Sequence, residues 1–351
     1  MSKKLRVMHM LCSNKYSGAE NVVCQIIGLT GSANFEFLYA SPDGPIKNAL
    51  ADRKITFIPM TEASVKEFKR VITQEKPDII HAHDMRASFL AALVCGKIPL
   101  ISHIHNNNFD SQKLTLKAIL YRYAAMKAKH IFWVSQSAFD GYYLHKGLEK
   151  KSTTLYNVID PIQLKEKADK AELKAVYDIV YIGRMTYQKN PQRLIEVLNQ
   201  IIKARPQTRC AMIGSGELED EVKENLCANG LSQNIDFWGF QANPYGILKR
   251  AKMMIMTSRW EGTPMCALEA MTLGIPIVST PTDGLKDLIK NGETGFLSDS
   301  DDGLKVGCIK ILDNGDLRTS MSRKSLERAT ELMNIDNYRR AILEQYEDKR
   351  K

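Results

Sequence analysis

Short apolar runs alternate with longer amphipathic segments along this chain, and the alternation occurs twice. In the first half, Ala19–Leu29 repeats apolar residues at helical spacing. Four runs there have the length and composition of buried strands: Leu5–Leu11, Asp78–His81, Leu100–His103 and Ile131–Ser135. In the second half a proline opens the helical segment Pro191–Ala204. The strand-like runs of that half are Tyr177–Ile182, Arg209–Ile213, Ile235–Trp238, Met253–Thr257 and Ile277–Ser279. The repeated order of strand, crossover helix and strand predicts an α/β protein with two Rossmann-like, doubly wound sheets.

The chain length of 351 residues suits two domains of ordinary size. The polar, charged segment 160–175 lies between the two halves and predicts a linker with some helix. We therefore expect an N-terminal domain at residues 1–165 and a C-terminal domain at residues 171–330. The remaining residues, 331–351, include a charged helical segment at 337–351 that we expect to pack back toward the N-terminal domain.

The composition is ordinary for a soluble globular protein, with 44% hydrophobic and 25% charged residues. None of the seven cysteines forms a C-x-x-C pair, which favours reduced thiols in a cytoplasmic protein over disulfides or zinc. The longest uncharged apolar run, Phe89–Gly96, is far shorter than the ~20 residues needed to cross a bilayer. We expect a cytoplasmic protein that is at most peripheral, at the inner face of the membrane.

The positive net charge of +9 lies entirely in the first half. Residues 1–170 hold 24 Lys or Arg and 15 Asp or Glu, whereas residues 171–351 hold 25 of each class. This asymmetry favours an anionic partner for the first half, and a solvated basic surface is the alternative. The segment SQKLTLKAILYRYAAMKAK places Lys113, Lys117 and Lys127 on one helical face, flanked by Tyr121 and Tyr123. A basic amphipathic helix of this kind is typical of binding to an anionic membrane surface.

Ligands of open α/β sheets bind at the carboxyl ends of the strands, where three glycine-bearing loops of this chain fall. In CSNKYSGAENVV, Gly18 allows close ligand approach before a helix start, and a plain turn is the alternative. In YIGRMTYQKNPQRLIEVL, Gly183 ends a strand and Arg184 and Lys189 follow it. Two cations at a helix start oppose the helix dipole unless an anion such as a diphosphate lies there, although they could also be solvated loop charges.

Two further loops give weaker evidence of a binding site. Gly214 and Gly216 follow the strand in CAMIGSGELEDEV, and the acid-rich helix after them predicts a structural turn near the ligand. The D-x-D spacing in DSDD, residues 299–302, suggests a metal, but its position in a polar loop favours a solvated turn, so we predict no metal site.

The stretch SRWEGTPMCALEAMTLGIPIVST places two glutamates eight positions apart. It predicts a short helix over Pro264–Leu273, with the N–H groups of Met265 and Cys266 positioned for a phosphate. Glu269 lies among apolar residues of this helix, where a carboxylate needs a hydrogen-bonding partner. A ribose diol would supply two donors, and a neighbouring arginine is the alternative.

These motifs together resemble retaining glycosyltransferases of family 4, which have the GT-B fold of two Rossmann-like domains facing across a cleft. EGTPMCALEAMTLGIPIVST resembles the E-x7-E signature, TDGLKDLIKNGETGFL the segment after it, and YIGRMTYQKNPQRLI the G-R-x4-K loop. PDIIHAHD, ISHIHN, WVSQSAFD and LYNVID match landmarks of the N-terminal domain. The resemblance covers most of residues 5–300 and is strongest at 178–298. The chain departs from the pattern at SGAE, Asp283 and Asp287, which bears on sugar specificity.

The resemblance implies a role for each of these positions. Arg184 and Lys189 would hold the diphosphate of a nucleotide-sugar, Glu269 the ribose, and Gly18 would approach the diphosphate. Glu261 with the turn Gly262, Thr263, Pro264 and Met265 would contact the donor sugar and phosphate. His105 would contact the transferred sugar, and a hydrogen-bonded strand-end histidine is the alternative. The predicted catalytic residues are Glu261, Arg184, Lys189 and His105.

The predicted activity is a retaining, metal-independent transfer of a hexose from a nucleotide-diphosphate-sugar, with UDP-sugar expected. The acceptor would be a glycan or a lipid-linked glycan in envelope or capsular polysaccharide synthesis, and the donor is a substrate, so no cofactor is expected. Retention would use front-face attack or a protein nucleophile. The alternatives are a GT-B-shaped epimerase or phosphorylase, or a basic nucleic-acid-binding protein. The last lacks support because the sequence has no recognisable nucleic-acid motif.

Overall fold

The computed structural model describes residues 4–31, 34–106, 109–170 and 175–347 and divides the chain into two units. The first unit is Met1–Asn157 together with Ile335–Lys351, and the second is Val158–Asn334. Residues 158–165 thus group with the second unit, a few residues away from the predicted domain bounds.

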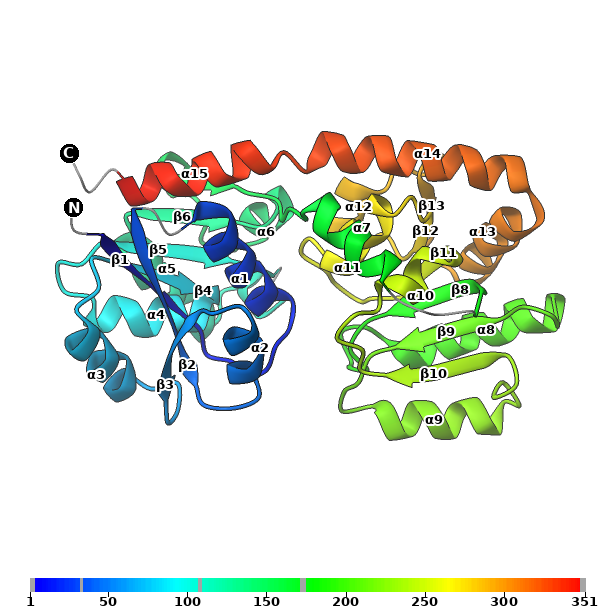
Figure 1. The fold of residues 1–351 in the computed structure, drawn as a ribbon, viewed down its shortest axis with the longest axis horizontal. Coiled ribbons are helices and arrows are strands. Elements are labelled where there is room, and N and C mark those ends of the chain that lie inside the picture. Colours follow the sequence, from blue (N-terminus) through cyan, green and yellow to red (C-terminus); the bar gives the residue numbers. More distant parts are fainter. Residues whose placement is uncertain (1–3, 32–33, 107–108, 171–174, 348–351) are drawn as a thin grey trace. The chain divides into compact units, whose positions relative to one another are not determined.

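The first unit is built on a seven-stranded parallel sheet in the order β3-β2-β1-β4-β5-β6-β7 (Figure 1). The strands are β1 (Leu5–Met10), β2 (Phe35–Pro42), β3 (Thr56–Met60), β4 (Ile79–His83), β5 (Leu100–Ile104), β6 (His130–Trp133) and β7 (Ser152–Thr154). The helices are α1 (Gly18–Thr30), α2 (Ile46–Asp52), α3 (Val65–Glu75), α4 (Asp84–Val94), α5 (Leu116–Lys127), α6 (Gln136–Asp140), α15 (Ile335–Glu347) and the 3-10 turns η1 (Phe109–Ser111) and η2 (Glu149–Lys151).

The second unit is built on a six-stranded parallel sheet in the order β10-β9-β8-β11-β12-β13. Its strands are β8 (Tyr177–Ile182), β9 (Cys210–Ile213), β10 (Ile235–Gly239), β11 (Ala251–Met256), β12 (Ile277–Ser279) and β13 (Gly295–Leu297). Its helices are α7 (Pro161–Asp169), α8 (Pro191–Ala204), α9 (Glu219–Ala228), α10 (Tyr245–Lys249), α11 (Met265–Thr272), α12 (Asp283–Leu288), α13 (Asp301–Asp313) and α14 (Gly315–Leu332).

Each sheet is buried because helices pack on it, as continuous apolar strands require. In the first unit, Met8, Ile80 and Leu100 face α4 and α5 across one core. In the second, Ile179 and Met253 belong to the core under α8 and α13, whereas Val180 and Met254 belong to the core on the other face. The predicted α/β class with two doubly wound sheets is therefore confirmed.

The predicted linker and the predicted C-terminal helix each form part of one unit. The predicted linker contains α7, whose first turn is capped by Asp160 and begins with Pro161, and which packs on α10 within the second unit. The C-terminal α15 packs beside α1 in the first unit (Figure 1). The last four residues of the predicted helix 337–351 lie outside the described part of the chain.

Within the described residues, no helix combines the length and the apolar character required to span a bilayer.

Candidate functional site

In the second unit, β8 and β11 are adjacent where the strand order reverses. Connections from β8 lead outward to β9 and β10, and those from β11 lead outward to β12 and β13. This is the topological switch point at which open α/β sheets bind ligands. The loops leaving these two strands, residues 183–190 and 257–264, carry most of the predicted site.

Hydrogen bonds join these two loops directly. The Arg259 N–H donates to the Gln188 carbonyl at 2.8 Å, and the Gln188 side chain donates to the Trp260 carbonyl at 3.0 Å. The Arg259 guanidinium donates to Asn190 Oδ1 at 2.9 Å and lies 4.2 Å above the Tyr187 ring centroid. The two loops therefore form one fixed element.

Lys189 and Glu261 form a buried ion pair between the loops. Lys189 Nζ lies 2.5 Å from Glu261 Oε1, and the same oxygen accepts a hydrogen bond from Ser258 Oγ at 2.5 Å. The two side chains are only 13% and 5% exposed. Burial opposes the charge of Lys189, but the attraction of Glu261 outweighs it and raises the Lys189 pKa. Lys189 therefore stays charged at neutral pH, and the structure brings together two residues that the sequence assigned to separate roles.

Arg184 is exposed at the start of the first loop, where its Nη2 donates to Gln188 Oε1 at 3.3 Å. The neighbouring glycines allow this loop to pack closely against the turn after β9. A Cβ on Gly214 would lie 1.9 Å from the Gly183 carbonyl oxygen, and one on Gly216 would lie 2.4 Å from the Met185 carbonyl oxygen. Gly214 and Gly216 thus support the Arg184 loop, in line with the structural role predicted for them.

The helix α11 begins one residue later than predicted, at Met265, and ends at Thr272. Pro264 is its N-cap, with extended ψ of 122°, rather than its first helical residue. No side chain caps this end, so the first backbone N–H groups, including those of Met265 and Cys266, are suited to an anion. The turn before the helix is buried from Glu261 through Thr263 and Pro264. Its Gly262 carbonyl packs tightly on Gly284, where a Cβ would lie 1.2 Å from that oxygen.

Glu269 is a buried carboxyl group with a hydroxyl partner. Its Oε1 accepts a hydrogen bond from Tyr245 at 3.0 Å, and the residue is 8% exposed. Burial raises the pKa of Glu269 to about 7, although the Tyr245 hydrogen bond acts in the opposite direction. The arginine partner considered from the sequence is thus replaced by Tyr245, which sequence reasoning did not identify.

Gly18 is the first residue of α1 and follows the loop after β1. Its φ is not in the left-handed region, and a Cβ there would have no heavy atom within 4 Å among the described residues. The local fold therefore does not require glycine at position 18, as it would if Gly18 occupied a tight turn.

His105 follows β5 and is held by two contacts. Its backbone N–H donates to Asp84 Oδ1 at 3.1 Å, and its Nε2 is 2.8 Å from His83 Nδ1. Burial lowers the pKa of His105 to about 4 and that of His9 to about 3, so both rings are neutral at pH 7. Asp84 itself has φ of +67°, a strained value for a residue other than glycine.

His83 and Asp84 were not identified as site residues from the sequence, although His83 ends β4 and Asp84 begins α4 at the switch point of the first sheet. The alternating histidines of PDIIHAHD and ISHIHN were the available signal, because residues two apart in a strand share a face. The structure groups His83 and Asp84 with His105 in the first unit, and groups Arg184, Lys189, Glu261 and Glu269 in the second.

The basic helix α5 differs from its expected pattern. Tyr121 is not a flanking surface residue but is buried against Trp133 and bonded to Ser102 at 3.0 Å. The outward face is instead strongly apolar, with six exposed side chains: Leu114, Leu116, Ile119, Leu120, Tyr123 and Met126. Five lie in the helix, at positions 116, 119, 120, 123 and 126, a spacing that forms one stripe. We call these six residues the α5 apolar face.

Two family models match the chain in sequence. The model for glycosyltransferase family 4 matches residues 17–163, and the model for glycosyl transferases group 1 matches residues 163–328. A galactosyltransferase of Escherichia coli, named for transfer from UDP-Gal to GlcNAc-diphosphoundecaprenol, is 26% identical over 332 residues, 85% of each protein. This chain is a glycosyltransferase.

Other relatives agree with this assignment. An uncharacterized glycosyltransferase of Methanocaldococcus jannaschii is 29% identical over 60% of this chain and 57% of its own length. The glycosyltransferase shares its GT-B fold with HepE of Anabaena in complex with UDP and glucose, at a TM-score of 0.85 and 18% identity over 98% of this chain and all of HepE. Sucrose-phosphate synthase of Thermosynechococcus elongatus superposes at a TM-score of 0.80, with 15% identity over 98% of this chain and 99% of the synthase.

Proposed function

We propose that this glycosyltransferase moves a hexose, with retention of configuration and without a divalent metal, from a UDP-sugar to a lipid-linked or polymeric glycan of the cell envelope. The observation that carries the proposal is the joined pair of loops at the β8–β11 switch point. These loops bring Arg184, the Lys189–Glu261 pair and the N-terminal end of α11 to the same sheet edge.

The chemistry follows from where charge develops. Cleavage of the bond between the sugar C1 and the phosphate oxygen leaves negative charge on the diphosphate. Arg184, Lys189 and the N–H groups of Met265 and Cys266 would stabilise this charge, the task that a metal ion performs in other enzymes. Lys189 is fixed before the donor binds, so little reorganisation is needed. The turn Gly262–Met265 would contact the donor phosphate and sugar.

Retention is assigned to front-face attack by the acceptor hydroxyl. A new bond forms from the acceptor oxygen to C1 on the face from which the diphosphate departs, and the hydroxyl proton passes to a departing phosphate oxygen. The environment of Glu261 supports this assignment over a protein nucleophile, because Lys189 and Ser258 both occupy its Oε1. In the first unit, His105 and Gly18 would contact the transferred sugar and the diphosphate.

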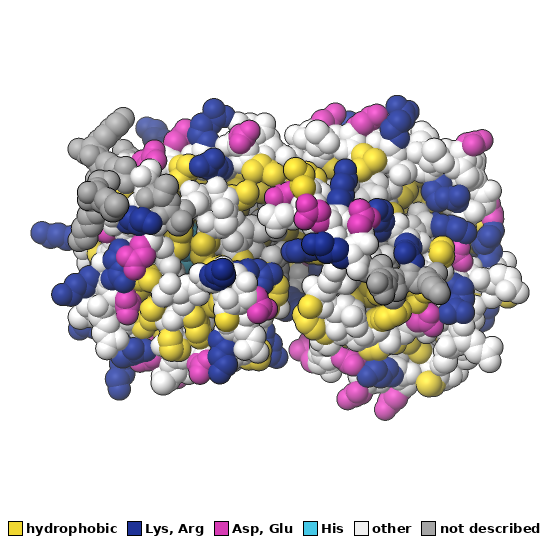
Figure 2. Space-filling model, viewed as in Figure 1, with side chains coloured by type: hydrophobic (Ala, Val, Ile, Leu, Met, Phe, Trp, Pro, Cys, Tyr) yellow, Lys and Arg dark blue, Asp and Glu magenta, His cyan; other side chains and the backbone are white. Residues whose placement is uncertain are grey.

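The lipid-linked acceptor is supported by the α5 apolar face. Lys113, Lys117 and Lys127 are exposed beside it, which complements an anionic lipid surface. The Escherichia coli relative is named for a diphosphoundecaprenol acceptor. On the face that Figure 2 shows, Lys and Arg are interspersed with Asp and Glu on both units, which gives no support to a nucleic-acid-binding surface.

Neutralising the phosphate-binding cations tests the proposal. Arg184→Gln and Lys189→Gln should each lower kcat for transfer from a UDP-sugar by about 100-fold, the effect of removing one preorganised charge contact. UDP affinity by calorimetry should fall as well, and EDTA should leave wild-type turnover unchanged. Lys223→Gln, in an exposed pair with Glu219, is the matched control.

The assay is run with and without a lipid-linked acceptor extract. Turnover of the UDP-sugar to an isomer without acceptor would indicate the epimerase instead. Wild-type donor binding and transfer in both Arg184→Gln and Lys189→Gln would overturn the proposal.

A further inference from the structure

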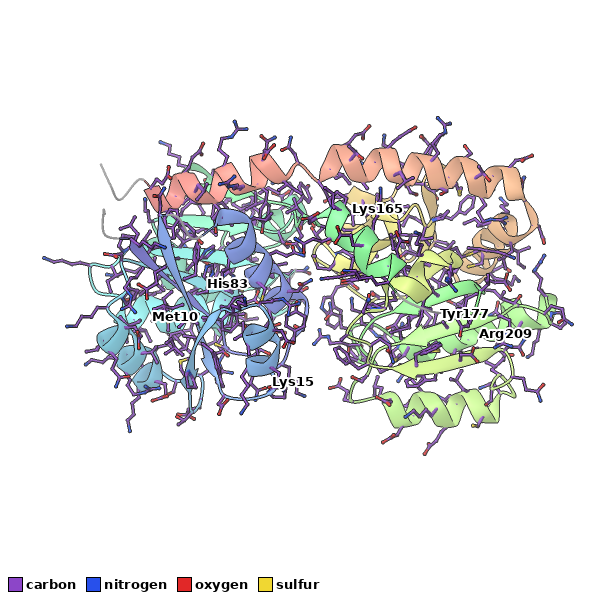
Figure 3. All side chains as sticks on the ribbon, viewed as in Figure 1. Met10, Lys15, His83, Lys165, Tyr177 and Arg209 are labelled. Atoms are coloured by element: carbon purple, nitrogen blue, oxygen red, sulfur yellow. The ribbon has the colours of Figure 1, made fainter. Side chains whose placement is uncertain are left out.

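One face of the first sheet is lined with histidine. His9 on β1, His81 and His83 on β4 and His103 on β5 are at most 2% exposed, and His105 follows in line. His9 is in register with His81, and His83 with His103, so their side chains share a face. His83, the last residue of β4, is labelled in Figure 3, and almost no histidine is visible on the face that Figure 2 shows. An interior sheet face ordinarily carries Val, Ile or Leu.

These rings leave several buried nitrogens without a hydrogen bond. Within the described residues they are His9 Nε2, His81 Nε2, His105 Nδ1 and both ring nitrogens of His103. A buried polar atom left unsatisfied costs about 1–3 kcal/mol. Two of these five atoms, His9 Nε2 and His81 Nε2, belong to a group of three close rings that is suited to a bound species that accepts nitrogen lone pairs.

The spacing of His9, His81 and His83 matches that of a metal centre. Their ligand nitrogens all lie within 4.8 Å of one another, and the ring centroids are 4.5, 5.0 and 5.2 Å apart. Three imidazoles bound tetrahedrally to Zn²⁺ at about 2.0–2.1 Å would have nitrogens about 3.3 Å apart and centroids about 5.2 Å apart. The three rings are inclined to one another by only 20–32°, so each would have to turn about its side-chain torsions until its plane contains the ion.

Outer hydrogen bonds already fix two of the three rings. His81 Nδ1 is 2.7 Å from the Tyr346 hydroxyl of α15, and His83 Nδ1 is 2.8 Å from His105 Nε2. The first bond leaves His81 Nε2 without a partner, whereas His83 Nε2 is 2.9 Å from His9 Nδ1, in a hydrogen bond that a bound ion would replace. Metal-binding histidines usually have their second nitrogen held by an outer bond of this kind. The overlapping group His83, His103 and His105 has no such outer bond among the described residues, because the His83–His105 hydrogen bond lies within the group and neither nitrogen of His103 has a partner.

We propose that His9, His81 and His83 bind one late first-row transition-metal ion of the zinc class, for which imidazole is a suitable ligand. The ion links β1 to β4 and, through Tyr346, both strands to α15. Its role is structural and lies within the first unit, apart from the diphosphate-binding residues of the second. The ion takes no part in the transfer reaction, although its ligand His83 is bonded to His105, which the proposed function places on the transferred sugar.

The test is metal uptake by the full chain, produced in medium with Zn²⁺ or refolded with Co²⁺. We expect about one equivalent of zinc by mass spectrometry, visible Co²⁺ absorption of a tetrahedral site, and a higher Tm with Zn²⁺. His81→Phe should abolish all three, and Tyr346→Phe should weaken Zn²⁺ affinity about 10-fold or more. His103→Phe, equally buried on the same face, is the matched control and should retain all three signals.

Two results would overturn the proposal. One is the absence of stoichiometric Zn²⁺ and Co²⁺ binding by the wild-type chain, a measurement that does not depend on any variant folding. The other is metal binding that is lost in His103→Phe and retained in His81→Phe, which would place the ion on the other group. Neither result affects the assay of UDP-sugar transfer.

Discussion

Lys189 and Glu261 are separated by 72 positions and meet in one buried ion pair. The sequence motifs identified both residues, because each stands in a strand-end loop with a characteristic spacing. Their contact could not be predicted, since it depends on which strands become neighbours in the sheet. The hydrogen bond from Tyr245 to Glu269 could not be predicted either, because nothing in the local sequence of one residue indicates the other.

Glu269 makes stability depend on pH in a definite direction. Its pKa is about 7 in the folded protein against an ordinary 4.5, so the folded state binds more protons between these values. The free energy of unfolding should therefore fall as pH rises from about 4.5 to 7 and remain lower above that. The free energy of unfolding of Glu269→Gln minus that of the wild type should increase by about 1–3 kcal/mol as pH rises from 5 to 8. Urea unfolding at each pH measures this difference. A constant difference across this pH range would contradict the assignment.

The same group should affect donor binding if its carboxylate accepts the ribose hydroxyls. The KM for the UDP-sugar should then rise as pH falls below about 7, because protonation removes acceptor capacity from Glu269. Glu269→Gln should show a raised KM with no such pH dependence. Parallel pH profiles for both proteins would exclude the ribose role.

At the scale of elements, the sequence located most strands to within two residues and missed four. The bounds of β8, β12 and α8 agree with those predicted. Three of the missed strands, β3, β7 and β13, are sheet edges, where strands are short or include proline, as at Pro59. On α5 the three lysines are exposed, but Lys113 precedes the helix and so does not lie on its face as predicted. The apolar stripe was not predicted, because alternative helix faces cannot be assigned without knowing which one packs on the sheet.

The α5 apolar face gives a prediction for membrane binding. Leu116→Glu with Met126→Glu should reduce flotation with phosphatidylglycerol vesicles by at least 10-fold, since each exposed side chain contributes about 1–2 kcal/mol when buried in lipid. Both side chains are more than 60% exposed, so the fold should be unaffected. Ile162→Glu, 69% exposed on α7 of the second unit, is the control. Equal flotation of the wild type with neutral and anionic vesicles would count against this surface.

At the scale of the whole molecule, the first unit depends on the last helix of the chain. Tyr338, Ile342 and Tyr346 of α15 are at most 3% exposed. Burying three such side chains contributes roughly 2 kcal/mol each, a large part of the stability of an ordinary domain. A chain ending at residue 334 should therefore lose hydrogen-exchange protection in β1 and β4 but keep it in β8 and β11. A chain ending at residue 347 is the control, and full protection of β1 after removal of α15 would refute the argument.

The position of α15 also bears on how the protein matures during translation. The second unit is contiguous, so all of its strands are synthesised before α15. The first unit begins at the N-terminus yet waits for Tyr346 to cover its histidine face. The unit synthesised first is thus completed only once α15 is available, and until then its uncovered sheet face is a surface to which chaperones can bind.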